Sequence, residues 1–370
     1  MLKYIRAGGG LSRVELSRKL DIAPSTIGIY VDRLINEGFL VETKRTAHKY
    51  GRRPMALLPN PNAGHFVGVD LEARNILAVV IDFSNNNLKQ LHRPISKGKP
   101  LEKILICIEE IVSSAIEADR RPLLGIGVGV PGTVDLEKGL ASEYDFIPNW
   151  KQVPLAERLA QKFGVPVYLE NNIRSMAMAE LWFGQGIGLQ NFICIGARTG
   201  VGIGAVVNGQ LLQGAHGAGG SIGKWLLPKI ARPWCNGRTG VTLESIASLR
   251  AILEACAATT RRKMDFSALQ VAIAANEYAA MKIVSQAAEI HGWAIHQLNL
   301  LFDPERIIVV GPLAELGSSF VEPLANMIHE LSQGDMPQIV SSNFGQYGGA
   351  FGTAALALQH WKPIRKQLSV

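Results

Sequence analysis

The excess of basic over acidic side chains, which could bind a polyanion, lies almost wholly in the first 60 residues of this sequence. Residues 1–60 hold eleven Lys and Arg against five Asp and Glu, whereas the other 310 residues hold 27 against 26. The net charge of +7 is therefore concentrated in one short segment. A basic segment on a nearly neutral chain favours a polyanionic partner, and double-stranded DNA is the first candidate.

The elements that must position these charges have the pattern of a helix-turn-helix. A short helix is expected over Leu2–Ala7. Ser12 and Glu15 have the spacing of a capping box, which predicts the start of a second helix. Pro24 suits the first turn of a third helix, whose apolar residues recur with a period of 3.6 until Gly38 ends it. The basic segment is thus predicted to form a helix-turn-helix, a motif that places a helix in a DNA groove.

Two strand-like runs follow, Phe39–Thr43 and Met55–Leu58, with a basic stretch between them. Helix, turn, helix and basic hairpin together predict a winged helix-turn-helix. The candidates for base and phosphate contacts are Ser25, Thr26, Ile29 and Tyr30 on the third helix and Lys44, Arg45, Lys49, Arg52 and Arg53 in the wing. The alternative is a helical protein-interaction module with a solvated charged loop.

After residue 60 the pattern changes to strands that alternate with helices, which predicts an α/β fold with a largely parallel sheet. The strand-like runs are Phe66–Leu71, Ile76–Ile81, Leu124–Val130, Val167–Leu169, Phe192–Ile195 and Arg306–Val310. The expected helices are Leu101–Ala118, Arg174–Phe183, 242–258 and 277–301, and glycine-rich loops are expected at Thr199–Gly204 and Gly345–Gly352. We expect a DNA-binding domain over 1–62, a first lobe over 63–185 to which a C-terminal helix 353–370 returns, and a second lobe over 186–352.

The spacing of the cysteines and the length of the apolar segments indicate the kind of cellular compartment. Cys107, Cys194, Cys235 and Cys256 are widely spaced and form no Cys-X-X-Cys pair, which favours free thiols. No segment approaches the roughly 20 apolar residues that a membrane helix needs, and no apolar leader is recognisable. We therefore expect a cytoplasmic protein without a membrane partner.

Short glycine-rich and polar motifs occur in a fixed order along nearly the whole chain. They are Gly51-Arg52-Arg53-Pro54, Gly68-Val69-Asp70-Leu71, Gly125 to Gly132, Pro148-Asn149-Trp150, Val153-Pro154-Leu155, Glu170-Asn171, Thr199-Gly200-Val201-Gly202, Asn208-Gly209, Ile222-Gly223, Leu243-Glu244 and Gly352-Thr353-Ala354-Ala355. In this order they resemble the ROK family, whose members are sugar kinases and sugar-responsive repressors. The resemblance implies a two-lobed, actin-like ATPase fold behind the winged helix-turn-helix.

The sequence departs from the pattern of the family's kinases where that pattern carries catalysis. The kinases follow the Asp-Leu of the first phosphate loop with two glycines and a threonine, where this chain has Glu72-Ala73-Arg74. Asn172 replaces the aspartate that is the kinases' general base, and an amide is a poor proton acceptor. Arg198 replaces a glycine of the second phosphate loop. These differences predict that the protein is not an enzyme.

The family's sugar and zinc positions are altered as well. Ser221 replaces a glutamate, and Lys224 replaces a histidine that contacts sugar or zinc in the family. Of three zinc cysteines only Cys235 remains, with Gly237 and Thr242 at the other positions. One thiolate cannot build a four-coordinate site, so we expect neither zinc nor another cofactor. The resemblance implies that an effector cleft is lined by Gly132, Asn171, Asn172, Ser221, Lys224 and Glu244.

Each departure also has a purely structural interpretation. Asn172 suits a helix start, Arg198 can pair with a nearby carboxylate, and Glu72 and Lys224 can point to solvent. None of these interpretations supplies a new base or a new phosphate site.

Three functions remain open at this stage. The first is a transcriptional regulator, a repressor, that binds double-stranded operator DNA as a homodimer or homotetramer and whose degenerate kinase-like body binds a sugar or sugar-phosphate effector. The second is a sugar kinase that phosphorylates a hexose or N-acetylhexosamine with ATP. The third is a regulator that responds to a protein partner and binds no small ligand.

Overall fold

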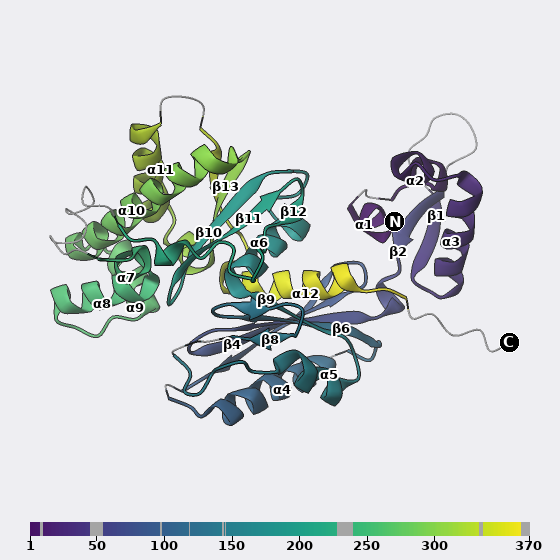
Figure 1. Cartoon of the computed structure of the whole chain (residues 1–370), viewed down its shortest axis with the longest axis horizontal. Helices are drawn as coiled ribbons and strands as arrows, with labels where there is room; N and C mark the ends of the chain where they lie inside the picture. The colour runs from purple at the N-terminus through teal and green to yellow at the C-terminus, as the bar shows by residue number, and fades with distance from the viewer. Residues whose placement is uncertain are drawn as a thin grey trace.

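The structure is a computed structural model that describes residues 1–7, 10–44, 55–96, 98–117, 119–142, 144, 146–227, 240–332 and 336–363. A small N-terminal head, drawn in purple, lies at one end of the molecule, beside two α/β lobes (Figure 1). Within the described residues, the search for a helix long and apolar enough to cross a membrane finds none.

The head is a winged helix-turn-helix, as the sequence predicts. Its elements are α1 (Leu2–Ala7), α2 (Arg13–Leu20), α3 (Pro24–Asn36), β1 (Leu40–Lys44) and β2 (Met55–Pro59). Both bonds of the capping box at Ser12 and Glu15 are present, and Pro24 occupies the first turn of α3. The apolar stripe of α3 is buried with Leu16, Leu40 and Leu57 in one core. The apolar residues that recur with a helical period in the sequence are therefore the residues that α3 buries in this core.

Lobe 1 is built on a five-stranded sheet. Its strands, in hydrogen-bonded order, are β5 (Asn87–Pro94), β4 (Asn75–Asp82), β3 (His65–Leu71), β6 (Leu123–Val130) and β9 (Val167–Asn171). Helices α4 (Leu101–Glu117) and α5 (Leu155–Phe163) cover one face, and α6 (Asn172–Phe183) and α12 (Gly348–His360) lie on the other (Figure 1). A short hairpin of β7 (Val134–Asp135) and β8 (Leu140–Ala141) follows β6.

Lobe 2 repeats this topology. Its sheet has the order β12 (Gln210–Leu211), β11 (Val201–Val207), β10 (Phe192–Ala197), β13 (Arg306–Val310) and β14 (Gln338–Ser341). One face packs on α6, and the other packs on a helical layer. The helices of this lobe are α7 (Leu243–Ala247), α8 (Leu249–Thr260), α9 (Phe266–Ala274), α10 (Tyr278–Phe302) and α11 (Ser318–Leu331). Helix α6 is therefore shared by both lobes.

The expectation of a largely parallel sheet is wrong. Among the described strands of each sheet, two of the four neighbouring pairs are antiparallel. The connection from β3 to β4 is a tight turn in which the Glu72 amide donates to the Asn75 carbonyl at 2.8 Å. Since a connection this short joins only antiparallel strands, the two apolar runs form a hairpin. The exposed edge strand β5 carries too weak an apolar pattern to be predicted.

Two expected helices have different bounds. The segment 242–258 is broken at Ser248, whose hydroxyl accepts from the Ala251 amide at 3.2 Å and caps α8. The C-terminal helix starts at Gly348 and ends at His360, so part of the expected glycine loop is helical. A Cβ atom at Gly352 would collide with the Ser175 carbonyl. These glycines therefore allow α12 to lie against α6 at close range.

The glycine run after β10 is also mostly regular structure. Only its beginning, at Thr199 and Gly200, forms a turn, because Val201 already begins β11. A Cβ atom at Gly204 would lie 2.5 Å from the Cβ of Ala177 on α6. Glycine is thus required here for strand–helix packing, and this does not depend on a bound phosphate.

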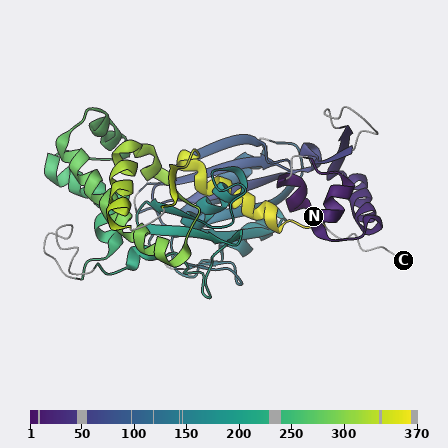
Figure 2. The same ribbon diagram turned by 90° about the horizontal axis from the view of Figure 1, so that it is seen from above.

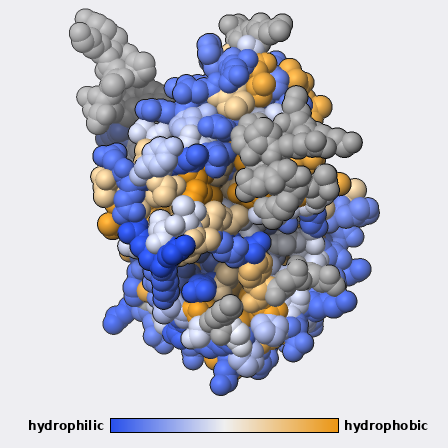
Figure 3. All heavy atoms as spheres, turned by 90° about the vertical axis from the view of Figure 1, so that its left-hand side faces the viewer, coloured by the Kyte–Doolittle hydropathy of each residue, from blue (hydrophilic) through white to orange (hydrophobic). Residues whose placement is uncertain are grey.

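Lobe 2, at the left-hand end of the molecule in Figure 1, carries exposed apolar side chains. Val271, Tyr278, Leu300 and Leu301 are each 66 % or more exposed. Figure 3 looks at this end of the molecule and shows hydrophobic patches interspersed among hydrophilic residues. Single exposed apolar residues are common on protein surfaces, so they identify no partner by themselves.

We expect His291, inside lobe 2, to make stability depend on pH. Its ring is fully buried on α10, its Nδ1 lies 2.8 Å from the Ala287 carbonyl, and burial lowers the pKa of His291 to about 4. In the unfolded chain the ring takes up a proton near pH 6.5. The stability that folding gains by burying the neutral ring is therefore complete above that pH and is lost as the pH falls toward 4.

The free energy of unfolding should therefore fall by about 2 kcal/mol from pH 7.5 to 5 on account of this group. When the free energy of unfolding is measured with urea at pH 7.5 and at pH 5, its change should be about 2 kcal/mol smaller in His291→Leu than in the wild type. The variant His329→Leu, at an exposed position, is the matched control and should keep the wild-type slope. An unchanged slope in His291→Leu would contradict this account.

Candidate functional site

The N-terminal half of α3 forms an exposed face on the head. Ile29 is 70 % exposed and Tyr30 is 53 % exposed, Ser25 is exposed as well, and Thr26 is half-buried beside them. Lys44 is exposed at the end of β1. The other predicted wing residues, Arg45, Lys49, Arg52 and Arg53, lie outside the described residues. The structure thus brings four predicted contact residues onto one accessible helix face.

Arg13 fixes this face relative to the rest of the head. Its guanidinium lies 2.6 Å from the Asp32 carboxylate on α3 and 2.8 Å from the Glu42 carboxylate on β1. One side chain therefore ties α2 to both neighbouring elements. The sequence pattern gives no signal for this role, because both partners are distant along the chain.

A cleft of about 700 Å³ lies between the two lobes. All six residues that the sequence predicts for an effector site line this cleft. Lobe 1 contributes Gly132, Asn171 and Asn172, together with Thr133, Ser142, Tyr144, Phe146 and Gln152. Lobe 2 contributes Ser221, Lys224 and Glu244, together with Arg198, Thr199 and Arg250. The fold thereby brings together residues that are far apart in the sequence, such as Gly132 and Arg250, which are separated by 118 positions.

Asn171 and Asn172 have different roles at the floor of the cleft. The amide oxygen of Asn171 caps α6 by accepting from the Ile173 and Arg174 amides at 2.9 and 3.2 Å. Its Nδ2 donates to the Gly132 carbonyl at 2.8 Å. Asn171 therefore shapes the wall, whereas Asn172, the first residue of α6, is the neighbouring amide that lines the cleft.

A buried ion pair below the cleft joins the two lobes. The Arg174 Nε donates to the Glu170 carboxylate at 2.7 Å, and both side chains are nearly inaccessible. Arg174 also donates to the Gly217 and Gly219 carbonyls of lobe 2, at 2.8 and 3.0 Å. Gln213 donates to the other Glu170 oxygen at 3.1 Å. The sequence singles out Glu170 but not Arg174, because an arginine inside a helix carries no motif signal.

Arg198 makes a second connection between the lobes. From the end of β10 its guanidinium lies 2.7 Å from the Asp70 carboxylate and 2.8 Å from the Glu72 carboxylate, both in lobe 1. Asp70 is fully buried and Arg198 is 9 % exposed. Burial raises the pKa of Asp70, and the Arg198 cation opposes that rise. The structural interpretation of Arg198 as a partner of a nearby carboxylate is confirmed.

This ion pair lies where the two glycine turns of a phosphate site would face each other. Glu72 begins the turn after β3, and Arg198 directly precedes the Thr199-Gly200 turn. A phosphate bound between these turns would have to displace a cation that is already neutralised within the chain. Such displacement would leave two carboxylates facing the phosphate, which is electrostatically unfavourable.

The mouth of the cleft is polar and aromatic. The Tyr144 hydroxyl lies 3.2 Å from the Thr199 hydroxyl across the cleft, and burial raises the pKa of Tyr144 to about 12. The Arg250 guanidinium lies 5.5 Å from the centre of the Phe146 ring. These two contacts across the cleft identify Tyr144, Phe146 and Arg250 as site residues that the sequence did not predict.

Glu244 lies on the lobe 2 wall, where a Cβ at Gly200 would come within 2.8 Å of its carboxylate and one at Gly223 within 2.6 Å. Lys224 and Ser221 are exposed at the same wall. These three residues thus offer a carboxylate acceptor, a hydroxyl and a cation on the lobe 2 side. Hydroxyl groups of a small polar ligand match such a set.

The expected loss of zinc falls partly outside the described residues, which exclude Cys235 and Gly237. Thr242 is described and directly precedes α7. Among the described residues, no group of three His, Cys, Asp or Glu side chains has a geometry that could hold a metal ion.

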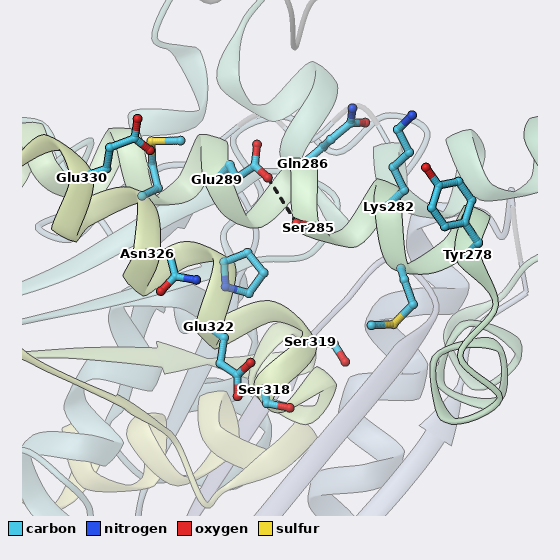
Figure 4. A pocket seen from close by; sticks show the side chains of 13 residues that line it. Tyr278, Lys282, Ser285, Gln286, Glu289, Ser318, Ser319, Glu322, Asn326 and Glu330 are labelled. Atoms are coloured by element: carbon cyan, nitrogen blue, oxygen red, sulfur yellow. Dashed lines mark hydrogen bonds between the residues drawn. The ribbon is translucent and has the colours of Figure 1, made fainter.

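A second hollow, of about 830 Å³, lies between α10 and α11 on lobe 2. Figure 4 shows its polar side chains, among which Ser285 donates to Glu289 at 3.2 Å. None of the site residues predicted from the sequence is among the described residues that line it. The cleft between the lobes is therefore the better candidate for an effector site.

Comparisons with known proteins agree with this division into head and body. The model of the ROK family matches residues 66–360, and a model of winged helix-turn-helix DNA-binding domains matches residues 1–41. The xylose repressor of Caldicellulosiruptor bescii is 28 % identical over 90 % of this chain and 87 % of its own length.

Two solved structures are similar over most of the chain. A ROK family transcriptional regulator, a homologue of the Escherichia coli MLC protein, superimposes with a TM-score of 0.80 at 25 % identity, covering 96 % of this chain and 93 % of that one. A ROK family glucokinase from Streptomyces griseus, in complex with glucose and AMPPNP, gives a TM-score of 0.71 at 25 % identity, covering 80 % of this chain and all of that one. The glucokinase thus matches a smaller share of this chain than the regulator does.

Proposed function

This chain belongs to the ROK family, and we propose that it is a transcriptional repressor that binds operator DNA with its head and a sugar-type effector in the cleft between its lobes. The observation that carries the proposal is the exposed N-terminal half of α3 on a basic winged helix-turn-helix. Repressors among the relatives that match nearly the full chain support it. Footprinting on the DNA beside the protein's own gene tests it, and protection of one or two palindromic sites is the expected result.

We propose that α3 enters the major groove with its N-terminal end first. Ile29 and Tyr30 then face base edges, while Ser25 and the helix N-terminus lie near a phosphate. Lys44 begins the wing that reaches the backbone beside it. A palindromic operator would hold two copies of the chain, so we also propose a homodimer or a homotetramer, which light scattering on the purified protein would test.

The effector we propose is a monosaccharide or its phosphate. A cleft of about 700 Å³ is large enough for such a ligand. Asn172, Ser221 and Glu244 would bind its hydroxyl groups, and the exposed Lys224 favours an added negative charge. Xylose is the first sugar to test, because several relatives are named xylose repressors.

We expect the effector to stabilise the protein and Asn172→Ala to remove that effect. At a ligand concentration of 100 Kd, binding should add about 2.7 kcal/mol to the free energy of unfolding. Thermal unfolding with D-xylose, D-glucose, N-acetylglucosamine and their phosphates measures this. Gln161→Ala, at an exposed position of α5, is the control and should keep the shift.

A loss of the shift in Lys224→Ala for phosphorylated sugars alone would identify a sugar phosphate as the effector. If no sugar of the panel shifts the unfolding temperature, the alternative of a regulator that responds to a protein partner replaces this proposal.

A sugar kinase is the second candidate, because glucokinases are among the relatives. Two features argue against it: Asn172 is a poor proton acceptor, and Arg198 pairs with Asp70 and Glu72 beside the Thr199-Gly200 turn. We expect no turnover above background when ADP release is followed with hexoses and N-acetylhexosamines. Turnover that disappears in Asn172→Ala would establish the kinase instead.

A further inference from the structure

Helix α12 touches all three parts of the molecule. It follows β14 of lobe 2 after a short 3-10 turn, η5 (Gly345–Tyr347). It then crosses the sheet of lobe 1 and ends beside the head. Both views show it, in yellow, running from the region between the lobes toward the head (Figures 1 and 2).

The first turn of α12 lies on the ion pair of the cleft. Gly349 is so close to Asp70 that a Cβ atom there would collide with the carboxylate that Arg198 holds. The hydroxyl of Thr353, one turn later, donates to the Val69 carbonyl at 3.1 Å. Any rearrangement of Arg198 and Asp70 therefore acts directly on the start of this helix.

The middle of α12 packs on lobe 1 through small residues. Cβ atoms at Gly68 and Gly127 would collide with the Ala350 and Thr353 carbonyls, so backbone lies directly on backbone. Ala354 and Ala357 continue the same face. Small sliding movements of packed helices are a known form of conformational switching, and such a movement would carry α12 along the sheet of lobe 1.

The end of α12 carries an aromatic contact with the head. The Trp361 ring lies 4.6 Å from the Phe39 ring of the head and 4.9 Å from the Phe83 ring of lobe 1, measured between centres. The Phe39 amide donates to the Leu34 carbonyl of α3 at 2.8 Å. Trp361 is thus connected to the C-terminal end of α3 through one residue, Phe39.

The Phe83 ring of lobe 1 also contacts a cation of the head. The Arg6 guanidinium of α1 lies 4.4 Å from the centre of the Phe83 ring, and burial lowers the pKa of Arg6 to about 10. Burial of the cation costs free energy, which its attraction to the Phe83 ring offsets in part. Because Arg6 lies in the head and Phe83 in lobe 1, this contact is a second connection between the two parts, beside Trp361.

We propose that α12 couples the cleft to the DNA-binding head, with Trp361 as the positioning residue that sets the orientation of Phe39 and α3. The arrangement of the Arg198–Asp70 ion pair fixes the position of the first turn of α12, and a movement of the helix changes the position of Trp361. This coupling rests on the proposed function for its biological role. Its physical content, that a change at Arg198 is felt in the head through Trp361, is independent of DNA.

A double-mutant cycle on operator affinity tests the coupling. Arg198→Lys keeps a cation beside Asp70 but cannot bridge Asp70 and Glu72 as a planar guanidinium does. We expect it to change the operator Kd at least about fivefold in a chain that has Trp361, and less than about 1.5-fold in Trp361→Ala. Trp361→Phe should restore the fivefold effect.

Trp182→Ala is the matched control, because Trp182 also contacts α12, through Gln359 at 3.3 Å. It should leave the effect of Arg198→Lys unchanged. Additive effects of Arg198→Lys and Trp361→Ala, or an equal loss of coupling in Trp182→Ala, would overturn the proposal.

Hydrogen exchange separates this coupling from the proposed function. In the absence of DNA, Arg198→Lys should change amide exchange around Leu34 and Phe39 in the wild-type background, and this change should disappear in Trp361→Ala. A change that persists without Trp361, or no change at all, would refute the coupling even if the protein binds its operator. If the chain binds no specific DNA but shows this exchange pattern, the proposed function fails and the coupling stands.

Discussion

We expect Ile29→Asp to abolish specific DNA binding and to leave the head folded. Ile29 is 70 % exposed, so its replacement removes few contacts and should change the free energy of unfolding by no more than about 0.5 kcal/mol. A carboxylate on the groove-facing side of α3 would meet phosphates and base edges, and buried like charge costs several kcal/mol. We expect the operator Kd, measured by fluorescence anisotropy, to rise at least about 100-fold.

The control for this experiment is Val271→Asp. Val271 is a comparable aliphatic residue, 66 % exposed on α9 of lobe 2. It receives the same charge, far from the head, and should keep the wild-type Kd within about twofold. Wild-type affinity in Ile29→Asp would show that α3 is not the recognition helix.

Arg198→Met should produce the largest loss of stability that the cleft allows. Removal of the cation leaves Asp70 fully buried without its partner, and breaking a buried ion pair on one side costs about 3–5 kcal/mol. Because burial already raises the pKa of Asp70, the variant takes up a proton there. The loss should therefore be smaller at pH 5 than at pH 8.

Two further variants make this result specific. The double variant Asp70→Asn/Arg198→Met carries no buried charge at this place and should recover most of the loss. Arg158→Met breaks an ion pair with the exposed Glu102 and one with Glu109, which is buried but keeps Lys162 as a partner, and should cost about 1 kcal/mol or less. Urea unfolding measures all of them, and equal losses in Arg198→Met and Arg158→Met would contradict the interlobe role of Arg198.

The head was largely predictable from the sequence, whereas the connections between the parts were not. The capping box at Ser12, the proline at the start of α3 and its apolar stripe are local signals, and the structure confirms each of them. The expected parallel sheets failed because strand direction depends on connections and edge strands that carry weak patterns. The roles of Arg198 and Trp361 depend on partners more than 120 residues away, Asp70 and Phe39.

The candidate effector site could be predicted in part. The six residues that the family resemblance implied all line one cleft. The sequence alone did not show that Asn171, besides lining the cleft, caps α6. It also gave no sign of Tyr144, Phe146 and Arg250, because their chemistry depends on contacts across the cleft.

The most direct test of a sugar-responsive repressor is a titration of its operator complex with sugars. Labelled DNA from beside the protein's own gene is bound first, and D-xylose and the other sugars of the thermal panel are then added while anisotropy is followed. We expect binding that weakens with salt, and release of the DNA by the same sugar that stabilises the free protein. Equal affinity for unrelated DNA, or a stabilising sugar that leaves the complex unchanged, would contradict the account.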